Sequence, residues 1–313
     1  MRNFRDHLIS SGETIKEALI KLDILAKDAI LFVVDENDVL IGSLTDGDVR
    51  RGLLKRITID DVVNNIIQPN PRFIRKGDRD ISKVIEYREG NFRILPVLDK
   101  DSKVVNVINF RETRSYLPVD AVIMAGGRGT RLQPLTDTVP KPLLKVGNKA
   151  IMEHNVDRLA LYGIPLGTIG AVSKIKNFEH DYILLTNSDI LTNLDYEHFF
   201  VDFLEQEADF SVVTIPYKVN VPYAVLETDE RQITNFKEKP SYTYYSNGGI
   251  YLMKKSVLKY IPEEVFYNTT DLMEKLIEEK KKVISYPLSG YWLDVGKHED
   301  FEKAQKDINQ IKF

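Results

Sequence analysis

The chain has 313 residues, a formal net charge of −4, and 43% hydrophobic and 29% charged residues. This length suggests two domains of ~150 residues, and the weak negative charge argues against a broad surface for nucleic acid or an anionic membrane. The absence of cysteine excludes disulfides, zinc–thiolate sites and a thiol nucleophile, and fits a reducing compartment. Because no apolar stretch approaches ~18 residues and the N-terminus lacks a signal-peptide pattern, we expect a cytoplasmic protein.

Residues 1–117 contain two similar units, each with a helix, a strand, a turn and a return strand. In the first unit, Thr14 is the predicted cap of a helix because a glutamate follows it three residues later. Apolar strands are predicted over Ile30–Asp35 and Val39–Thr45, which form a hairpin. The second unit, over Phe73–Glu112, repeats this order.

The first hairpin runs into a polar helix start over Gly42–Asp48. With the repeat, this pattern resembles a tandem CBS (Bateman) module, an α+β regulatory module, over residues 1–117. In that family a Thr/Ser-x-x-Asp step binds the ribose hydroxyls of an adenine nucleotide, and the resemblance places the step on Thr45 and Asp48. The second unit has Asn109–Glu112 there, so we expect at most one adenine-nucleotide site. The alternative is a module that only dimerises or packs on the rest of the protein.

A glycine cluster follows a linker that ends at Pro118. The apolar run Ala121–Met124 predicts a buried parallel strand. The glycines of Gly126–Gly129 allow backbone N–H groups to close on an anion, because no Cβ stands in the way. Arg131 and Lys141 add two cations, and the lysine lies between two prolines. The spacing matches neither a P-loop nor a dinucleotide fingerprint, yet it predicts a polyphosphate site.

The remainder of the chain alternates strands and helices, which is typical of an α/β domain over residues 118–313. The predicted helices are Ile151–Tyr162, a second helix near Gly170–Phe178, Asp271–Lys281 and a last amphipathic helix that carries Phe301 and Ile308. The predicted strands are Tyr182–Thr186, Ala208–Pro216, Ala224–Glu227, Ile233–Phe236, Gly249–Met253 and Val283–Leu288.

Two carboxylates follow apolar segments of this domain. Asp189 is the last residue of the Asn-Ser-Asp run that follows the strand at Tyr182–Thr186, and Asp294 lies in a Trp-Leu-Asp-Val-Gly run. A carboxylate beyond the carboxyl end of a parallel strand faces the ligand crevice of an open α/β sheet. Because carboxylate oxygens and nucleotide phosphates are ligands that Mg²⁺ prefers, we predict that Asp189 and Asp294 hold Mg²⁺.

Five motifs occur in one order, at Ala125–Leu144, Asn187–Asp189, Lys237–Pro240, Asn247–Tyr251 and Trp292–Gly296. Over residues 119–313 this order resembles the sugar-phosphate nucleotidyltransferases (nucleoside-diphosphate-sugar pyrophosphorylases). The resemblance implies a Rossmann-like mixed sheet and the reaction NTP + sugar 1-phosphate → NDP-sugar + pyrophosphate. Together with CBS units it is similar to a bacterial branch, the glucosamine-1-phosphate guanylyltransferases of legionaminic acid biosynthesis. That branch implies GTP, a hexosamine or hexose 1-phosphate, and surface-glycan precursors.

The resemblance also assigns roles to individual residues. Catalysis falls to Arg131, Lys141, Asp189 and Asp294, of which the two aspartates bind the metal. The nucleotide-binding residues are Ala125, Gly126, Gly127, Gly129, Thr130, Gly167 and Thr168. The sugar-phosphate residues are Glu238, Lys239, Asn247 and Gly248.

The sequence departs from this family after the helix at Ile151–Tyr162. Ile164 runs directly into Pro165, where the family has a further strand, helix and strand. A crossover helix in a parallel sheet needs a strand to which it returns. Either a segment is absent from this sequence record, or the protein has a real truncation with a broken sheet.

Two functions follow from these observations. The first is a Mg²⁺-dependent nucleotidyltransferase with CBS-mediated regulation, which forms a homo-oligomer and binds neither nucleic acid nor membranes. The second is a catalytically impaired protein whose CBS module senses adenine nucleotide and whose second half is a substrate-binding remnant.

Overall fold

The computed structural model describes residues 3–127, 129–164, 178–262 and 267–311. The chain divides into two units, Met1–Pro118 and Val119–Phe313, and each is described by itself. The predicted helix near Gly170–Phe178 lies almost entirely outside the described residues. No helix among the described residues is both long and apolar enough to cross a membrane.

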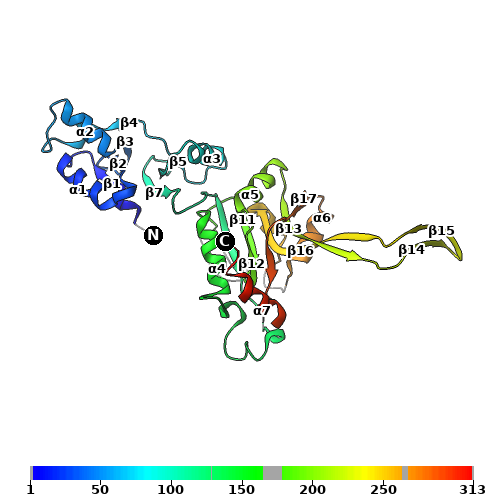
Figure 1. Ribbon diagram of the computed structural model, residues 1–313. Coiled ribbons are helices and arrows are strands. Elements are labelled where there is room, and N and C mark those ends of the chain that lie inside the picture. The colour runs from blue at the N-terminus through cyan, green and yellow to red at the C-terminus, as the bar shows by residue number, and fades with distance from the viewer. Residues whose placement is uncertain (1–2, 128, 165–177, 263–266, 312–313) are drawn as a thin grey trace. The chain divides into compact units, whose positions relative to one another are not determined.

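The first half of unit 1 is a four-stranded sheet covered by two helices (Figure 1). The strands β1 (Leu8–Ser10), β2 (Leu31–Val34), β3 (Leu40–Leu44) and β4 (Gln68–Pro69) lie side by side in that order. The helices are α1 (Ile15–Leu25) and α2 (Asp46–Leu54), with short 3-10 turns at Phe4–His7, Ala26–Asp28 and Val63–Asn65. The predicted cap of α1 is confirmed, because the Thr14 hydroxyl oxygen accepts from the Glu17 amide while the Glu17 carboxylate accepts from the Thr14 amide.

The second half of unit 1 repeats the arrangement with fewer elements. A three-stranded sheet contains β5 (Ile74–Arg75), β6 (Ile94–Leu98) and β7 (Val104–Asn109), and helix α3 (Ser82–Glu89) lies between β5 and β6 in the sequence. In both halves the first strand is parallel to the second, and the second and third form an antiparallel hairpin. An apolar cluster with Val34, Leu98 and Val104 at its centre joins the two halves.

Unit 2 is built on a five-stranded mixed sheet in the order β17-β13-β16-β11-β8. Its strands are β8 (Val119–Met124), β11 (Tyr182–Asn187), β13 (Phe210–Asn220), β16 (Ser241–Lys254) and β17 (Val283–Pro287). Its helices are α4 (Ile151–Leu161), α5 (Tyr196–Glu205), α6 (Thr269–Glu278) and α7 (His298–Asp307). Smaller elements are β9 (Lys145–Val146), β10 (Lys149–Ala150), β12 (Ile190–Thr192), β14 (Val225–Asp229), β15 (Gln232–Lys237), β18 (Trp292–Asp294) and 3-10 turns at Thr130–Leu132, Lys141–Leu143 and Lys255–Tyr260.

The predicted parallel strand before the glycines is confirmed. β8 is parallel to β11, with Val119 opposite Tyr182 and Met124 opposite Asn187. Both strands are apolar and buried along nearly their whole length, as expected for strands covered on both faces. β8 lies at one end of the sheet, and no strand between α4 and β11 is present among the described residues. Residues 165–177, which connect α4 to β11, lie outside the described residues, so the predicted break in the sheet after Ile164 stays a prediction.

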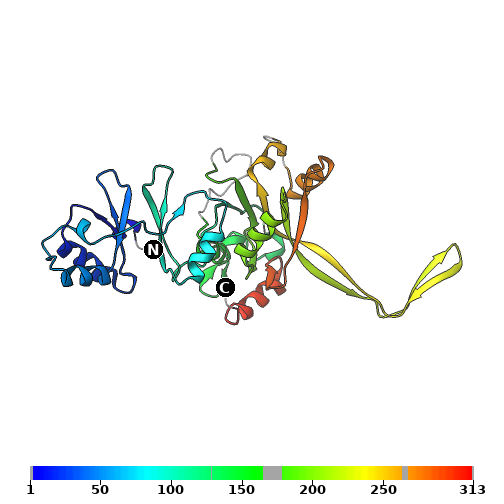
Figure 2. The same ribbon diagram turned by 90° about the horizontal axis from the view of Figure 1, so that it is seen from above.

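The strands β13 and β16 continue far beyond the core of the sheet, which the sequence analysis did not expect. The predicted strands ended at Pro216 and began at Gly249, whereas β13 runs to Asn220 and β16 starts at Ser241. Their outer halves pair with each other and lead to the β14–β15 hairpin, which lies far from the sheet in both views (Figures 1 and 2). We call residues 215–246 the ribbon arm.

Candidate active site

Strand pairing brings the two predicted metal-binding carboxylates together. The strands β12 and β18 are antiparallel, with Ile190 opposite Asp294, and the Val295 amide donates to the Asp189 carbonyl at 2.9 Å. Asp189 lies two residues after the end of β11, while Asp294 ends β18. The register therefore places both residues beside each other beyond the carboxyl end of a parallel strand, where α/β sheets bind ligands.

Lys141 lies between these two carboxylates. Its Nζ is 2.5 Å from Oδ2 of Asp189 and 3.6 Å from Oδ1 of Asp294. The prolines on either side restrict the backbone of Lys141, because a proline ring holds its own φ angle and limits the residue before it. The side chain is only 13% exposed, so its charge acts on Asp189 with little screening by water.

The glycine loop between β8 and the first 3-10 turn borders the same place. The Ser188 amide donates to the Met124 carbonyl at 3.0 Å, which holds the start of the loop beside β11. Gly129 has a φ of +63°, and a Cβ there would lie 2.9 Å from Thr136 and 3.4 Å from the Cβ of Lys141. Only glycine allows this close approach in a left-handed conformation. Ala125, Gly126, Gly127 and Thr130 belong to the same loop.

Arg131 is the fourth predicted catalytic residue at this place. Its guanidinium lies close to Gly296, two residues after Asp294. Burial and the negative charge of Asp189 raise the pKa of Asp294, and the positive charges of Lys141 and Arg131 offset part of that rise. An additional positive charge at the site would therefore favour the ionised form of Asp294 and lower its pKa.

The donor set fits Mg²⁺. Oδ1 of Asp189 and Oδ1 of Asp294 are both buried and accept no hydrogen bond, a costly condition that a bound cation would relieve. The site offers a cation two carboxylates. No larger cluster is present among the described residues, which contain no group of three or more His, Cys, Asp or Glu side chains suited to a metal. Mg²⁺ is commonly held by one or two carboxylates, with phosphates and water as the other ligands.

The predicted sugar-binding residues on β16 lie next to this centre. The Trp292 indole donates to the Gly248 carbonyl at 2.8 Å, and Asn247 accepts from the Gly249 amide at 2.8 Å. Gly249 has a φ of +70°, and a Cβ there would lie 2.7 Å from the Asn187 side chain. The role of Trp292 as a clamp on β16 was not foreseen. Trp292 is the only tryptophan in the chain and lies inside the Trp292–Gly296 motif, and its role could have been predicted from this signal.

Glu238 and Lys239 are not brought to this centre. Both lie on the ribbon arm just beyond β15, and both are exposed. Sequence reasoning placed them at the sugar phosphate because of the order of motifs, but the long ribbon formed by β13 and β16 separates them from the sheet (Figure 2). Gly167 and Thr168, the remaining predicted nucleotide-binding residues, lie outside the described residues.

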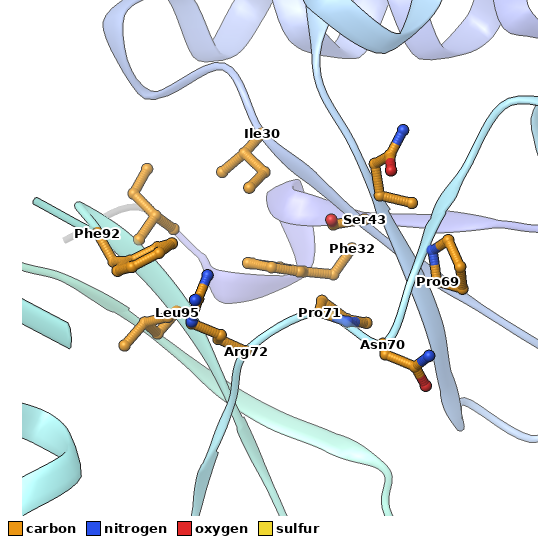
Figure 3. A pocket seen from close by; sticks show the side chains of 11 residues that line it. Ile30, Phe32, Ser43, Pro69, Asn70, Pro71, Arg72, Phe92 and Leu95 are labelled. Carbon is orange, nitrogen blue, oxygen red and sulfur yellow. The ribbon is translucent and has the colours of Figure 1, made fainter. Parts of the chain in front are cut away.

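Unit 1 contains a cavity of about 500 Å³ between its two halves (Figure 3). Apolar side chains form much of its wall, including Ile30 and Phe32 of the first half and Phe92 of the second. Arg72 adds a positive charge, and its guanidinium carbon lies 4.2 Å from the ring centroid of Phe92. A flat aromatic group with a nearby anionic substituent would suit this lining.

Thr45 and Asp48, the predicted ribose-binding residues, are not part of the cavity lining. Oδ2 of Asp48 accepts from the amide and hydroxyl of Thr45, and Oδ1 accepts from Arg51 and from Gln68. Burial opposes ionisation of Asp48, but these hydrogen bonds outweigh it and hold its pKa below the ordinary value. Gln68 lines the cavity and contacts Asp48, so the aspartate lies behind the wall, and a ribose would have to displace an existing donor.

Two protein-family models match the chain. The model described as "Nucleotidyl transferase" matches residues 120–166 and 163–311, and the model described as "CBS domain" matches residues 7–55. The two stretches of the first match meet at residues 163–166, where the sequence analysis places the absent segment. The CBS match covers most of the first half of unit 1, and the second half has a similar strand order.

Two curated relatives and one solved structure are similar to part of the chain. A mannose-1-phosphate guanyltransferase of Schizosaccharomyces pombe is 28% identical over 58% of this chain and 62% of its own length. A glucose-1-phosphate adenylyltransferase of Bacillus thuringiensis is 26% identical over 60% of this chain and 67% of its own. The chain thus spans about two thirds of these relatives. The crystal structure of HddC from Yersinia pseudotuberculosis has a TM-score of 0.45 at 23% identity and covers 60% of this chain and 99% of HddC. The chain therefore belongs to the nucleotidyl transferase family, with sugar-phosphate nucleotidyltransferases among its relatives, and it also carries a CBS domain.

Proposed function

We propose that this protein transfers a nucleotidyl group from a nucleoside triphosphate to a sugar 1-phosphate. A phosphate oxygen of the sugar 1-phosphate attacks the α-phosphorus, the bond between that phosphorus and the α–β bridging oxygen breaks, and pyrophosphate leaves. The observation that carries the proposal is the meeting of Arg131, Lys141, Asp189 and Asp294 beside a glycine loop at the carboxyl end of β11. Such a reaction needs positioning and charge stabilisation but no covalent enzyme intermediate.

Each residue of this centre has a task in the proposed reaction. Backbone N–H groups of Gly126, Gly127 and Gly129 cradle the triphosphate, because glycines leave them accessible. Arg131 offsets charge that develops on the leaving pyrophosphate, and Lys141 faces the phosphates from its proline-restricted turn. Asp189 and Asp294 would hold Mg²⁺, which, when bound, neutralises phosphate charge and fixes the triphosphate geometry.

We propose GTP as the preferred nucleotide and a hexosamine or hexose 1-phosphate as the acceptor, for the synthesis of a surface-glycan precursor. The resemblance to a guanylyltransferase branch supports GTP, and one curated relative is named as a guanyltransferase. Another is named as an adenylyltransferase, so ATP is the competing nucleotide. The Asn247–Gly248 backbone beside Trp292 supports a sugar pocket at the β16 end of the site.

The direct test is release of pyrophosphate from GTP, ATP, UTP, CTP and dTTP. Each is paired with glucosamine-, N-acetylglucosamine-, mannose- or glucose-1-phosphate in the presence of Mg²⁺. The variant Asp189→Asn keeps the size of the side chain and should abolish turnover, whereas Asp202→Asn on α5 should leave it intact. Near wild-type turnover of Asp189→Asn would remove the basis of the assignment.

One observation favours a second function. Glu238 and Lys239 are exposed on the ribbon arm and away from the carboxylates, so the sugar-phosphate side of the site is incomplete in a single chain. The protein would then bind nucleotide without turning it over. Nucleotide binding by calorimetry, together with no pyrophosphate release from folded protein, would favour this reading over the enzyme.

We further propose that unit 1 regulates unit 2 by binding an adenine nucleotide. The apolar and aromatic lining of the unit 1 cavity, with Arg72 as its cation, supports a base and a phosphate. Ribose binding by Thr45 and Asp48 stays a prediction. It requires the Asp48 carboxylate to lose its hydrogen bond from Gln68 or Arg51 and to accept one from the sugar instead. Titration with AMP, ADP and ATP should show binding that Arg72→Ala weakens, whereas binding unchanged in this variant would move the site elsewhere.

A further inference from the structure

The ribbon arm has one strongly apolar face. Residues directly opposite each other in an antiparallel pair point to the same side, and neighbours along a strand point to opposite sides. The register of β13 and β16 therefore gathers one set of side chains on one face. This set, which we call the tyrosine face, consists of Ile215, Tyr217, Val219, Tyr242, Tyr244 and Ser246.

The other face of the ribbon is more polar. Its cross-strand pairs are Pro216 with Tyr245, Lys218 with Thr243, and Asn220 with Ser241. A half-buried strand alternates apolar and polar residues in this way when one of its faces is covered. The pattern of the ribbon therefore predicts a cover over the tyrosine face.

Within unit 2, the tyrosine face is left open to solvent. Tyr217 is 63% exposed and Tyr244 is 59% exposed, although they are cross-strand neighbours in the middle of the face. At the tip of the arm, Leu226 and Phe236 are also neighbours and are 52% and 62% exposed. A two-stranded ribbon is marginally stable by itself in water, and contiguous exposed apolar surface of this kind marks an interaction site.

We propose that two copies of this chain associate by packing the tyrosine faces of their ribbon arms against each other. The size of the surface suits this occupant. A tyrosine buries ~150–250 Å² when fully covered, so the exposed parts of Tyr217 and Tyr244, with smaller shares from Val219 and Tyr242, supply on the order of 350 Å² per chain. With the strand backbone added, this falls at the low end of interface sizes, below the ~800 Å² per partner of a standard interface, and suits a weak, reversible dimer.

The chemistry of the face also suits a second copy. An isologous contact places the same patch on both partners, so a charged patch would meet its own charge. The tyrosine face contains no charged side chain, whereas the opposite face carries Lys218. Tyrosine is enriched and lysine is depleted in the cores of protein interfaces. Of the two faces, the tyrosine face is therefore the one that fits its own copy.

The first experiment is sedimentation equilibrium of the full chain over a range of concentrations. The wild type should dimerise, and Tyr217→Lys/Tyr244→Lys should weaken the dimer at least 100-fold, because like charges then meet in the contact. The matched control Asn220→Lys/Thr243→Lys adds the same charge to the opposite face and should dimerise normally. A wild type that stays monomeric, or a dimer that the first pair of substitutions does not weaken, would overturn the proposal.

A second experiment locates the contact independently of its strength. The chain contains no cysteine, so Val219→Cys on the tyrosine face and Asn220→Cys on the other face each introduce a unique thiol. Two packed ribbons run either parallel or antiparallel to each other. A bis-maleimide with a span of about 15 Å exceeds the ~13 Å between positions 215 and 219, so it can join the two thiols in both orientations. Val219→Cys should cross-link at least tenfold faster than Asn220→Cys. Equal rates would place the association elsewhere, for instance on unit 1, and would refute the proposal even if the lysine variants misfold.

Discussion

Replacement of Lys141 by methionine should strengthen the binding of a divalent metal to the nucleotide-free protein while slowing the proposed reaction. Lys141 lies where a cation between Asp189 and Asp294 would lie, with Nζ 2.5 Å from Asp189 and 3.6 Å from Asp294. A metal ion that enters must displace this ammonium group before it can use both carboxylates. Methionine fills a similar volume without the charge, so it removes the competitor and also the cation that faces the phosphates.

The expected size of the effect follows from the contact with Asp189. Two unit charges ~4 Å apart attract by ~4 kcal/mol at an effective dielectric constant of ~20. The Asp294 side chain is 43% exposed, so water screens its share, and we count only the Asp189 contact. A hydrogen bond to a charged group contributes ~1.5–3 kcal/mol net. Because ~1.4 kcal/mol is a factor of ten in affinity, Lys141→Met should bind metal ~10- to 100-fold more tightly.

The assay is calorimetric titration with Mg²⁺, or Mn²⁺ binding followed by electron paramagnetic resonance, without nucleotide at pH 8. Lys145→Met, at the exposed start of β9, is the matched control and should bind metal like the wild type. Unchanged or weaker metal binding by Lys141→Met, in a protein whose metal binding Asp189→Asn abolishes, would refute the competition between lysine and metal.

Three further predictions concern the pH dependence of the site, its glycine contact and unit 1. Because burial and Asp189 raise the pKa of Asp294 above its ordinary value of 3.8, metal affinity should rise with pH through that pKa. The free energy of unfolding in urea without metal, taken as wild type minus Asp294→Asn, should fall as the pH rises through that pKa, because the folded state holds the proton more tightly than the unfolded state. A difference that rises with pH would contradict the assignment. Gly249→Ala should lower the melting temperature and also metal affinity, because the added Cβ meets Asn187 two residues before Asp189; wild-type values in both measurements would show that the strands adjust freely. Thr14→Ala should destabilise unit 1 by ~1 kcal/mol in chemical denaturation, because the cap of α1 is lost, whereas a neutral result would mean that water replaces the cap.

Local features of this protein are determined by its sequence. The cap at Thr14, the hairpins of unit 1, the buried strand β8 and the end of α4 at Gly163 could all be predicted, because each depends on neighbouring residues or on side-chain periodicity. The order of motifs also indicated the family, and a family model matches the region that carries them. The departure from the family pattern after Ile164 is likewise a local inference, and the residues directly after it, 165–177, lie outside the described residues.

The tertiary structure decided which of these residues meet. Asp189 and Asp294 are neighbours because β12 pairs with β18, and Lys141 joins them from a turn in another part of the chain. The sequence assigned Lys141 to phosphates alone and Glu238 to the same site, since the order of motifs carries no distances. Strand pairing over long sequence separations is set by packing and register rather than by local preference. The same pairing extends β13 and β16 into the ribbon arm, where it exposes the tyrosine face and separates Glu238 from the carboxylates.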